Sequence, residues 1–108
     1  MLISEAAVVL HLHIRVQPEK LTEFWDYVQQ AFPVFEARGD CKGMVYAEGD
    51  EPGCFDEVFY YQSEAAYLAG EKAIRENPVE IALLAQWRSL LAEAPRVEVQ
   101  RRVNRPGS

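Results

Sequence analysis

Cysteine is scarce in this sequence. Of its 108 residues, two are cysteines, Cys41 and Cys54. Residues 49–53 have the composition of a hairpin turn, which would place Cys54 near residue 48 and Cys41 near residue 61, too far apart for a disulfide. We therefore expect two free thiols. Because the sequence also starts without a secretory leader, this pattern predicts a reducing, cytoplasmic compartment.

Basic charge and long apolar runs are also lacking. Acidic residues outnumber basic ones by 17 to 11, which gives a net charge of −6 at pH 7, whereas a surface that binds nucleic acid needs basic residues to displace counterions from phosphates. No apolar run approaches the ~20 residues of a membrane-spanning helix. We therefore expect neither nucleic acid nor a membrane as a partner. The acidic residues Asp50, Glu51 and Asp56 match no calcium-loop spacing, and we expect them in a solvated turn.

The stretch from residue 8 to residue 16 is the most informative pattern that is present. With the two-residue period of a strand, it has one wholly apolar face and one mixed face. The apolar face comprises Val8, Leu10, Leu12, Ile14 and Val16, and the mixed face comprises Val9, His11, His13 and Arg15. Neither face suits exposure to water, so we expect a central strand that is covered on both sides.

The remaining residues predict three more strands and three helices. Pro18 suits the first turn of a helix, and apolar residues follow it at three- and four-residue spacing up to Phe35. Pro33 lies inside this pattern and predicts a kink or a break. Ser63 and Asn77 are natural N-caps for two later helices. The expected elements after the first strand are a helix from 18 to about 37, strands at 41–48 and 55–62, helices at 64–76 and 78–92, and a strand at 96–103.

This β-α-β-β-α-β order predicts an α+β, ferredoxin-like fold, with residues 1–108 forming a single domain. Short connections and right-handed crossovers favour a four-stranded antiparallel sheet with its helices on one face. The apolar side of the first strand then packs on the helices. The other side, with Val9, His11 and His13, has no element of the chain to cover it. We expect a second copy to cover it, which predicts a homodimer with these three residues at the interface.

At this point the chain resembles a known family. Three features resemble the dimeric α+β barrel superfamily. They are the layout of elements, the strand end at residues 18–20 (Pro-Glu-Lys) with the helix start that follows, and the run at residues 60–67 (Tyr-Tyr-Gln-Ser-Glu-Ala-Ala-Tyr). The nearest groups are its antibiotic biosynthesis monooxygenase-like and NIPSNAP-like domains, and the resemblance covers about residues 8–103. It implies a homodimer in which two sheets face each other, with a small-molecule pocket between sheet and helices. Some members oxidise polycyclic aromatic compounds with oxygen and no cofactor; others bind haem or catalyse cyclisation or isomerisation.

The resemblance also implies catalytic residues. The pocket tyrosine of the cofactor-free monooxygenases matches Tyr67, and their pocket tryptophan falls at Tyr61. Their asparagine falls at Glu57, and their arginine has no counterpart near Leu84. A desolvated Glu57 could act as a general base with a raised pKa. The alternative is that Tyr61 and Tyr67 are core aromatics and that Glu57 is a salt-bridged strand residue.

Two tryptophans and one strand residue are candidate pocket walls. Trp25 and Trp87 lie on the helical faces that cover the sheet, where they either fill the core or flank a flat aromatic ligand. Leu12 lies on the strand face that borders any such pocket. Two hypotheses follow: a cofactor-independent monooxygenase acting on a small aromatic or quinol-like compound, or a non-catalytic small-molecule-binding or structural homodimer.

The pair His11-x-His13 is the most specific local motif. On a strand, both rings point the same way, about 6.5–7 Å apart, a spacing that can chelate a metal. A third ligand would have to come from Glu57 or Glu48, because the sequence has no further histidine. We expect no metal and no cofactor. Instead we expect the two histidines to titrate near their ordinary pKa of ~6.5 at the dimer interface.

Overall fold

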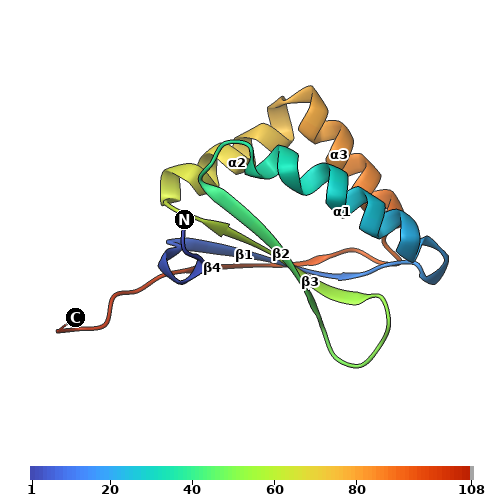
Figure 1. Cartoon of the computed structure of the whole chain (residues 1–108), viewed down its shortest axis with the longest axis horizontal. Helices are drawn as coiled ribbons and strands as arrows, with labels where there is room; N and C mark the ends of the chain where they lie inside the picture. The colour runs from blue at the N-terminus through green and yellow to red at the C-terminus, as the bar shows by residue number, and fades with distance from the viewer. Residues whose placement is uncertain (108) are drawn as a thin grey trace.

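The computed structural model describes residues 1–107, and its main elements follow the predicted order (Figure 1). Two short 3-10 turns, Ile3–Glu5 and Pro18–Lys20, precede the first strand and the first helix. The strands and helices are β1 (Val8–Arg15), α1 (Leu21–Glu36), β2 (Cys41–Ala47), β3 (Cys54–Tyr61), α2 (Glu64–Glu76), α3 (Pro78–Leu90) and β4 (Arg96–Arg101). Within residues 1–107, no helix is long and apolar enough to cross a membrane.

The four strands form one sheet in the order β2-β3-β1-β4, and every neighbouring pair is antiparallel. The three helices all lie on one side of this sheet (Figure 1). The predicted α+β ferredoxin-like fold is therefore confirmed, with β1 and β3 in the centre. The register pairs Leu12 with Glu57 on β3 and with Val97 on β4, so these three residues share the face that the helices cover.

Helix α1 is continuous, so of the two outcomes predicted at Pro33, a kink or a break, the break does not occur. The helix runs from Leu21 to Glu36 with Pro33 inside it. A proline in a helix interior costs one backbone hydrogen bond and about 3 kcal/mol. Ala31 and Phe32, just before Pro33, are buried against the rest of the protein. This burial holds the last turn of the helix in place despite the missing bond.

The caps of α2 and α3 are the ones that the sequence predicts. Ser63 Oγ accepts a hydrogen bond from the Ala66 backbone N–H at 3.1 Å. Asn77 Oδ1 accepts from the N–H groups of Val79 and Glu80 at 3.0 and 3.2 Å. Asn77 thereby ends α2 and starts α3 at the same point. This tight connection places Glu80 in the first turn of α3, where it becomes buried.

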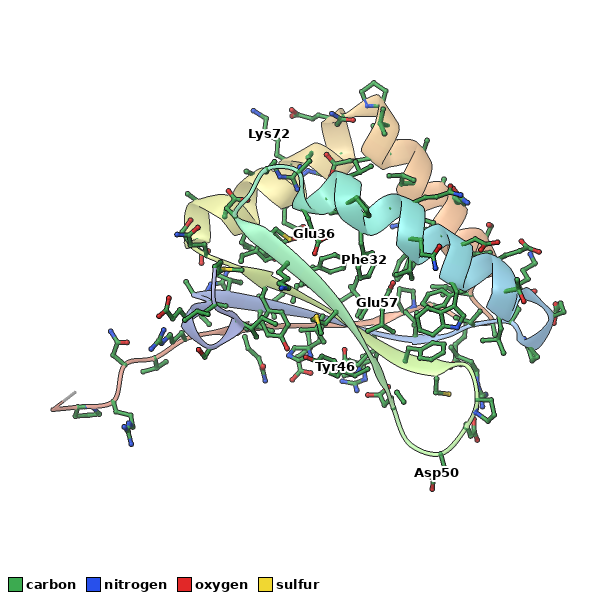
Figure 2. All side chains as sticks on the ribbon, in the orientation of Figure 1. Phe32, Glu36, Tyr46, Asp50, Glu57 and Lys72 are labelled. Carbon is green, nitrogen blue, oxygen red and sulfur yellow. The ribbon has the colours of Figure 1, made fainter. Side chains whose placement is uncertain are left out.

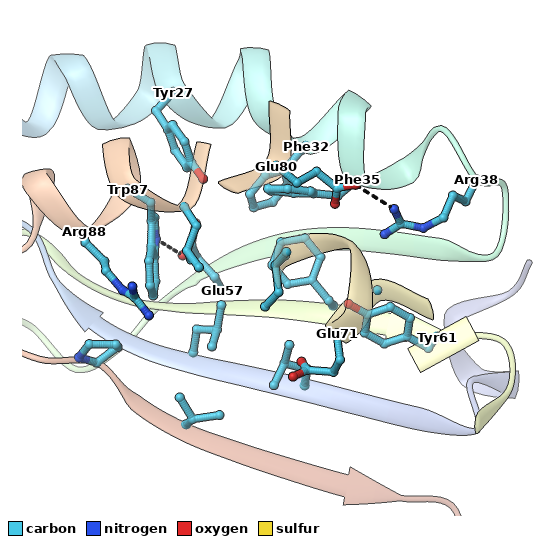
Figure 3. Close-up of a pocket in the computed structure, with 18 residues that line it drawn as sticks. Tyr27, Phe32, Phe35, Arg38, Glu57, Tyr61, Glu71, Glu80, Trp87 and Arg88 are labelled. Atoms are coloured by element: carbon cyan, nitrogen blue, oxygen red, sulfur yellow. Dashed lines mark hydrogen bonds and ion pairs between the residues drawn. The ribbon is translucent and has the colours of Figure 1, made fainter. Parts of the chain in front are cut away.

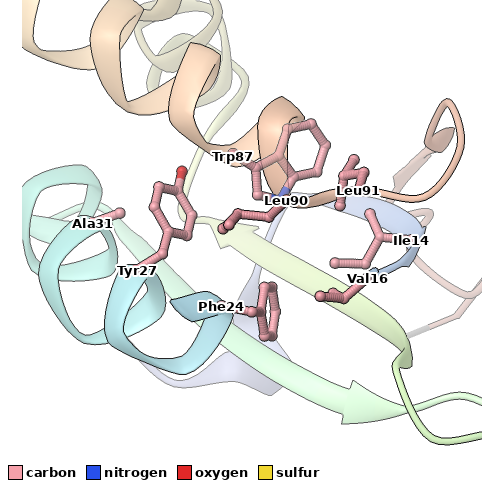
Figure 4. Close-up of a cluster of buried hydrophobic side chains, with 8 residues drawn as sticks. All are labelled: Ile14, Val16, Phe24, Tyr27, Ala31, Trp87, Leu90 and Leu91. Carbon is pink, nitrogen blue, oxygen red and sulfur yellow. The ribbon is translucent and has the colours of Figure 1, made fainter. Parts of the chain in front are cut away.

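The core consists of two apolar clusters between sheet and helices. The first joins α1, α3 and the C-terminal part of β1 (Figure 4), and in it Phe24 is fully buried and its ring stacks on Phe55 at 5.1 Å. The second lies nearer the other end of the sheet and includes Phe32 and Phe59. These two rings are accommodated because Gly43 faces them: a Cβ at Gly43 would lie 2.7 Å from Phe32 and 2.9 Å from Phe59. A gap remains between the helices and the middle of the sheet, and it forms the candidate site.

Candidate functional site

A cavity of about 220 Å³ lies between the sheet and the three helices (Figure 3). Its walls are mostly apolar, with Leu10 and Leu12 of β1 on the sheet side. The aromatic residues that line it are Tyr27, Phe32, Phe35, Phe59, Tyr61 and Trp87. Concave, mostly apolar sites with a few polar groups are the usual form of small-molecule sites. The volume is below the ~300 Å³ typical of drug-sized ligands, so the cavity suits a compact molecule.

Glu57 is the central polar group of this cavity. It lies in the middle of β3 on the helix-facing side, and it is 1% exposed. Trp87 Nε1 donates a hydrogen bond of 2.6 Å to Glu57 Oε2, whereas Oε1 is buried and has no hydrogen-bond partner among the described residues. Burial raises the pKa of Glu57 to about 7, even though the Trp87 hydrogen bond lowers it. Glu57 can therefore both hold and release a proton near neutral pH.

A second carboxylate marks another part of the cavity lining. Glu80 of α3 is 4% exposed, and Arg38, after α1, donates a hydrogen bond to its Oε2 at 3.0 Å (Figure 3). Glu80 Oε1 is also buried, with no partner in residues 1–107. Neither Arg38 nor Glu80 was predicted from the sequence. Glu80 is three residues after the N-cap Asn77, which is the ordinary position of a helix-capping glutamate, so its position indicated a cap rather than a site.

The two candidate tyrosines occupy different places. Tyr61 lines the cavity and is 6% exposed, and burial raises the pKa of its hydroxyl, which stays protonated. Tyr67 is not part of the cavity lining, which corrects its expected position in the pocket. Its ring packs edge-on against Tyr61, with centroids 5.5 Å apart, and the Arg101 guanidinium lies 5.6 Å from its centre. Tyr67 therefore contacts the site through Tyr61.

The candidate pocket walls are also divided. Trp87 and Leu12 line the cavity as predicted, whereas Trp25 does not. Trp25 is 43% exposed and packs edge-on against Phe24 and Phe55. Adjacent residues of a helix point about 100° apart. Because Phe24 takes the buried position, the neighbouring Trp25 is turned towards the surface, and its prediction as a pocket wall is corrected.

Val9, His11 and His13 lie on the opposite side of the sheet, facing away from the helices, as the strand period predicts. Figure 2 shows Tyr46 on this side, whereas Glu57 and Phe32 lie on the helix side. The face is more polar than expected, because both histidines contact carboxylates. Burial lowers the pKa of His13, but hydrogen bonds to Glu98 and Glu48 outweigh this and raise it above its ordinary value. That these residues form a dimer interface stays a prediction.

Comparisons with known proteins identify the fold. No protein-family model and no curated protein matches the chain. A solved structure from Caulobacter crescentus, provisionally described as an antibiotic biosynthesis monooxygenase, is 20% identical with a TM-score of 0.75, over 93% of this chain and 92% of its own. One from Bordetella bronchiseptica with the same provisional description is 19% identical with a TM-score of 0.72, over 92% and 99%. A conserved protein from Methanosarcina mazei is 18% identical with a TM-score of 0.73, over 94% and 97%.

These comparisons confirm, at the level of fold, the predicted resemblance to antibiotic biosynthesis monooxygenase-like proteins; the resemblance to NIPSNAP-like domains stays a prediction. The matched structures cover nearly the whole chain at similar size. At these identities the likeness concerns backbone architecture and carries no residue roles. The chain thus has the fold of antibiotic biosynthesis monooxygenase-like proteins.

The raised pKa of Glu57 predicts a pH-dependent stability. The folded state holds the Glu57 proton up to about pH 7, whereas an unfolded glutamate releases it near the ordinary 4.5. Glu57 therefore makes its full contribution to the free energy of unfolding below about pH 4.5, and this contribution is lost as the pH rises to about 7. Glu57→Gln keeps an acceptor for Trp87 but cannot ionise. Between about pH 4 and pH 8, the free energy of unfolding of this variant, measured with urea, should rise by about 3 kcal/mol relative to that of the wild type. A difference between the two proteins that does not change with pH would contradict the raised pKa of Glu57.

Proposed function

We propose that this protein is a cofactor-independent monooxygenase that acts on a compact aromatic, phenolic or quinol-like compound bound in the cavity. The observation that carries the proposal is Glu57, a buried carboxyl at the cavity with a pKa of about 7 and one oxygen that has no partner within residues 1–107. A general base works best when its pKa is close to the operating pH. Glu57 meets this condition, and its free Oε1 is the atom that would accept a proton from the substrate.

The other residues of the cavity support this role. Trp87 fixes the Glu57 carboxyl through Oε2, which leaves Oε1 for the substrate. The aromatic walls suit a flat ring, because offset and edge-on ring contacts are favourable. Tyr61 keeps its hydroxyl proton and would donate a hydrogen bond to a developing substrate oxyanion. Tyr67 would hold the Tyr61 ring in position from outside the cavity.

The proposed reaction needs no electrons from a cofactor. Glu57 removes a proton from an acidic ring methylene or hydroxyl, and the resulting carbanion or phenolate transfers electrons to molecular oxygen. For a methylene that becomes a carbonyl, one oxygen atom enters the substrate and the other leaves as water with the two hydrogens. The substrate supplies all four electrons, so atoms and electrons balance.

The second candidate function is a non-catalytic homodimer that binds a small molecule. It is favoured by a departure from the family pattern, with Glu57 at the asparagine position. Leu84 is not an arginine either, although Arg88, one turn later on α3, also lines the cavity. In this case Glu57 would serve as a hydrogen-bonding group for the ligand rather than as a base. The two candidates share the cavity and differ in the role of Glu57 and in whether oxygen is consumed.

We also infer that the protein self-associates through the face of the sheet that lacks helices. This face combines the acidic residues Glu48, Asp56 and Glu98 with Arg96, so that a two-fold axis can bring opposite charges together. Tyr46 adds an exposed aromatic group there. The two unpaired thiols, Cys41 and Cys54, fit the proposed reducing, cytoplasmic setting.

Ligand binding can be measured through the two tryptophans. The Trp25→Phe variant retains only Trp87, which lines the cavity, and the Trp87→Phe variant retains only the exposed Trp25. With 4-nitrophenol as a compact phenolic probe, the fluorescence of the Trp25→Phe variant should be quenched along a saturating curve. The Trp87→Phe variant should show only the linear quenching of random collisions. Linear quenching in both variants would exclude the cavity as the binding site.

Catalysis is tested by oxygen uptake with anthrone, whose ring methylene becomes a carbonyl. Glu57→Gln should lower kcat by about 100-fold or more, the typical contribution of a general base, with little change in KM. Glu23→Gln, on the exposed side of α1, is the matched control and should behave like the wild type. Oxygen uptake at the wild-type rate in Glu57→Gln would refute the role of Glu57 as the general base. Saturable binding of the phenol without any oxygen uptake would favour the non-catalytic candidate.

Self-association predicts a mass in solution of twice the 12.3 kDa of the chain. Sedimentation equilibrium at micromolar concentration measures this directly. Tyr46→Glu places a charge on the proposed interface and should shift the equilibrium towards the single chain. Leu68→Glu, on the exposed side of α2, is the control and should leave the dimer intact. A wild-type mass of one chain would disprove the dimer.

A further inference from the structure

The face of the sheet that lacks helices carries a cluster of two histidines and three carboxylates. The rings of His11 and His13 on β1 are nearly parallel, with centroids 5.8 Å apart. Asp56 on β3 pairs with His13 in the register, and Glu98 on β4 pairs with His11. Glu48, directly after β2, completes the cluster from the other side. The antiparallel register thus brings residues from four parts of the chain to one place.

Each imidazole has an acceptor oxygen beside both of its nitrogens. His13 Nδ1 lies 2.6 Å from Glu48 Oε1, and its Nε2 lies 3.1 Å from Glu98 Oε1. His11 Nδ1 lies 2.9 Å from Asp56 Oδ2, and its Nε2 lies 2.9 Å from Gln100 Oε1. A neutral imidazole carries one N–H and cannot satisfy two acceptors. His13 lies between two carboxylates, so a cation on one side of its ring, either an added proton or a metal ion, satisfies both of them. At His11 the Gln100 amide can present either its oxygen or its N–H group to Nε2, so a metal-bound ring and a neutral ring are both satisfied there.

The surroundings favour the Nδ1 side for that cation. When the N–H of each ring is on Nε2, His13 donates to Glu98 and His11 to Gln100, both on β4, and the Nδ1 lone pairs then point to the side where Asp56 and Glu48 lie. Histidines that bind a metal commonly donate their other N–H to a carboxylate or carbonyl in this way. Asp56 Oδ1 is buried without a hydrogen-bond partner in the described part of the chain, and it lies 3.8 Å from His13 Nδ1.

We propose that Nδ1 of His11, Nδ1 of His13 and the Asp56 carboxylate bind a divalent transition-metal ion of the zinc class, with Glu48 as a fourth ligand. The ligand atoms of the first three residues all lie within 4.8 Å of one another. Two ligands about 2.0–2.1 Å from a tetrahedral zinc ion are ~3.3–3.5 Å apart. His11 Nδ1 lies 2.9 Å from Asp56 Oδ2 and His13 Nδ1 lies 3.8 Å from Asp56 Oδ1, so both spacings are within about 0.6 Å of that value.

The type of ligand selects the class of metal. Two imidazole nitrogens with carboxylate oxygens suit zinc, iron or copper, whereas calcium and magnesium prefer six or more oxygens. The charge fits as well, since the dication is surrounded by the carboxylates of Asp56, Glu48 and Glu98. The site lies on the other side of the sheet from Glu57, extends beyond the proposed oxidation and does not depend on it. It shares Glu48, Asp56 and Glu98 with the face proposed for self-association.

The test is zinc binding by the full chain after removal of any affinity tag and treatment with a chelator. Calorimetry should give one zinc ion per chain with a dissociation constant of about 1 µM or below. The cobalt-substituted protein should show the intense visible absorption of a tetrahedral site. X-ray absorption should give nitrogen and oxygen ligands at about 2.0–2.1 Å. Calcium and magnesium at the same concentrations should not compete.

Matched variants distinguish this site from loose binding by acidic residues. His13→Asn and Asp56→Asn should each weaken zinc binding by at least about tenfold. Glu51→Gln removes an exposed carboxylate of the neighbouring turn that pairs with Arg15, and it should leave the affinity unchanged. The proposal is overturned if the wild type takes up no zinc in a saturable way, or if folded His13→Asn and Asp56→Asn bind like the wild type. Because binding is read without any substrate, this outcome is independent of the oxygen-uptake experiment.

Discussion

The hydrogen bond from the Trp87 indole to the Glu57 carboxyl is the interaction around which the candidate site is built. This buried hydrogen bond is 2.6 Å long and joins α3 to the central strand β3. A carboxyl placed there without a donor would carry a large desolvation cost. With one donor it is held in position, yet its second oxygen has no partner among the described residues. The same burial raises its pKa to about 7, so the feature that makes Glu57 costly for folding is the one that makes it useful for proton transfer.

The sheet separates two sets of polar groups that are neighbours in the sequence. Asp56 and Glu57 are adjacent on β3, but the strand period directs them to opposite faces. Glu57 faces the aromatic cavity below the helices, and Asp56 faces the histidines of β1. A shift of one residue in the register would exchange these two environments. The central position of β1 and β3 is thus needed both for the cavity and for the proposed metal site.

The fold was predictable from local patterns, and the site was predictable in part. The apolar period of β1, the caps Ser63 and Asn77 and the order of elements were sufficient for the sheet and its helical layer. Glu57, Tyr61, Trp87 and Leu12 were identified as site residues and do line the cavity. Trp25 and Tyr67 were misplaced. Trp25 follows the buried Phe24 on α1 and points to the surface instead, and the ring of Tyr61 lies between Tyr67 and the cavity. Arg38 and Glu80 were missed, because their pairing joins distant parts of the chain.

The sequence by itself determined which residues are apolar, where the helices start and which side chains share a strand face, since these depend on neighbours along the chain. Only the tertiary structure decided that α1 continues through Pro33, that Glu57 loses contact with water, and that Asp56 lies beside His11 and His13 rather than in a solvated turn. The physical reason is the same in each case. Burial and pairing depend on what lies across the sheet and above it, and the free energy of those contacts outweighs local preference.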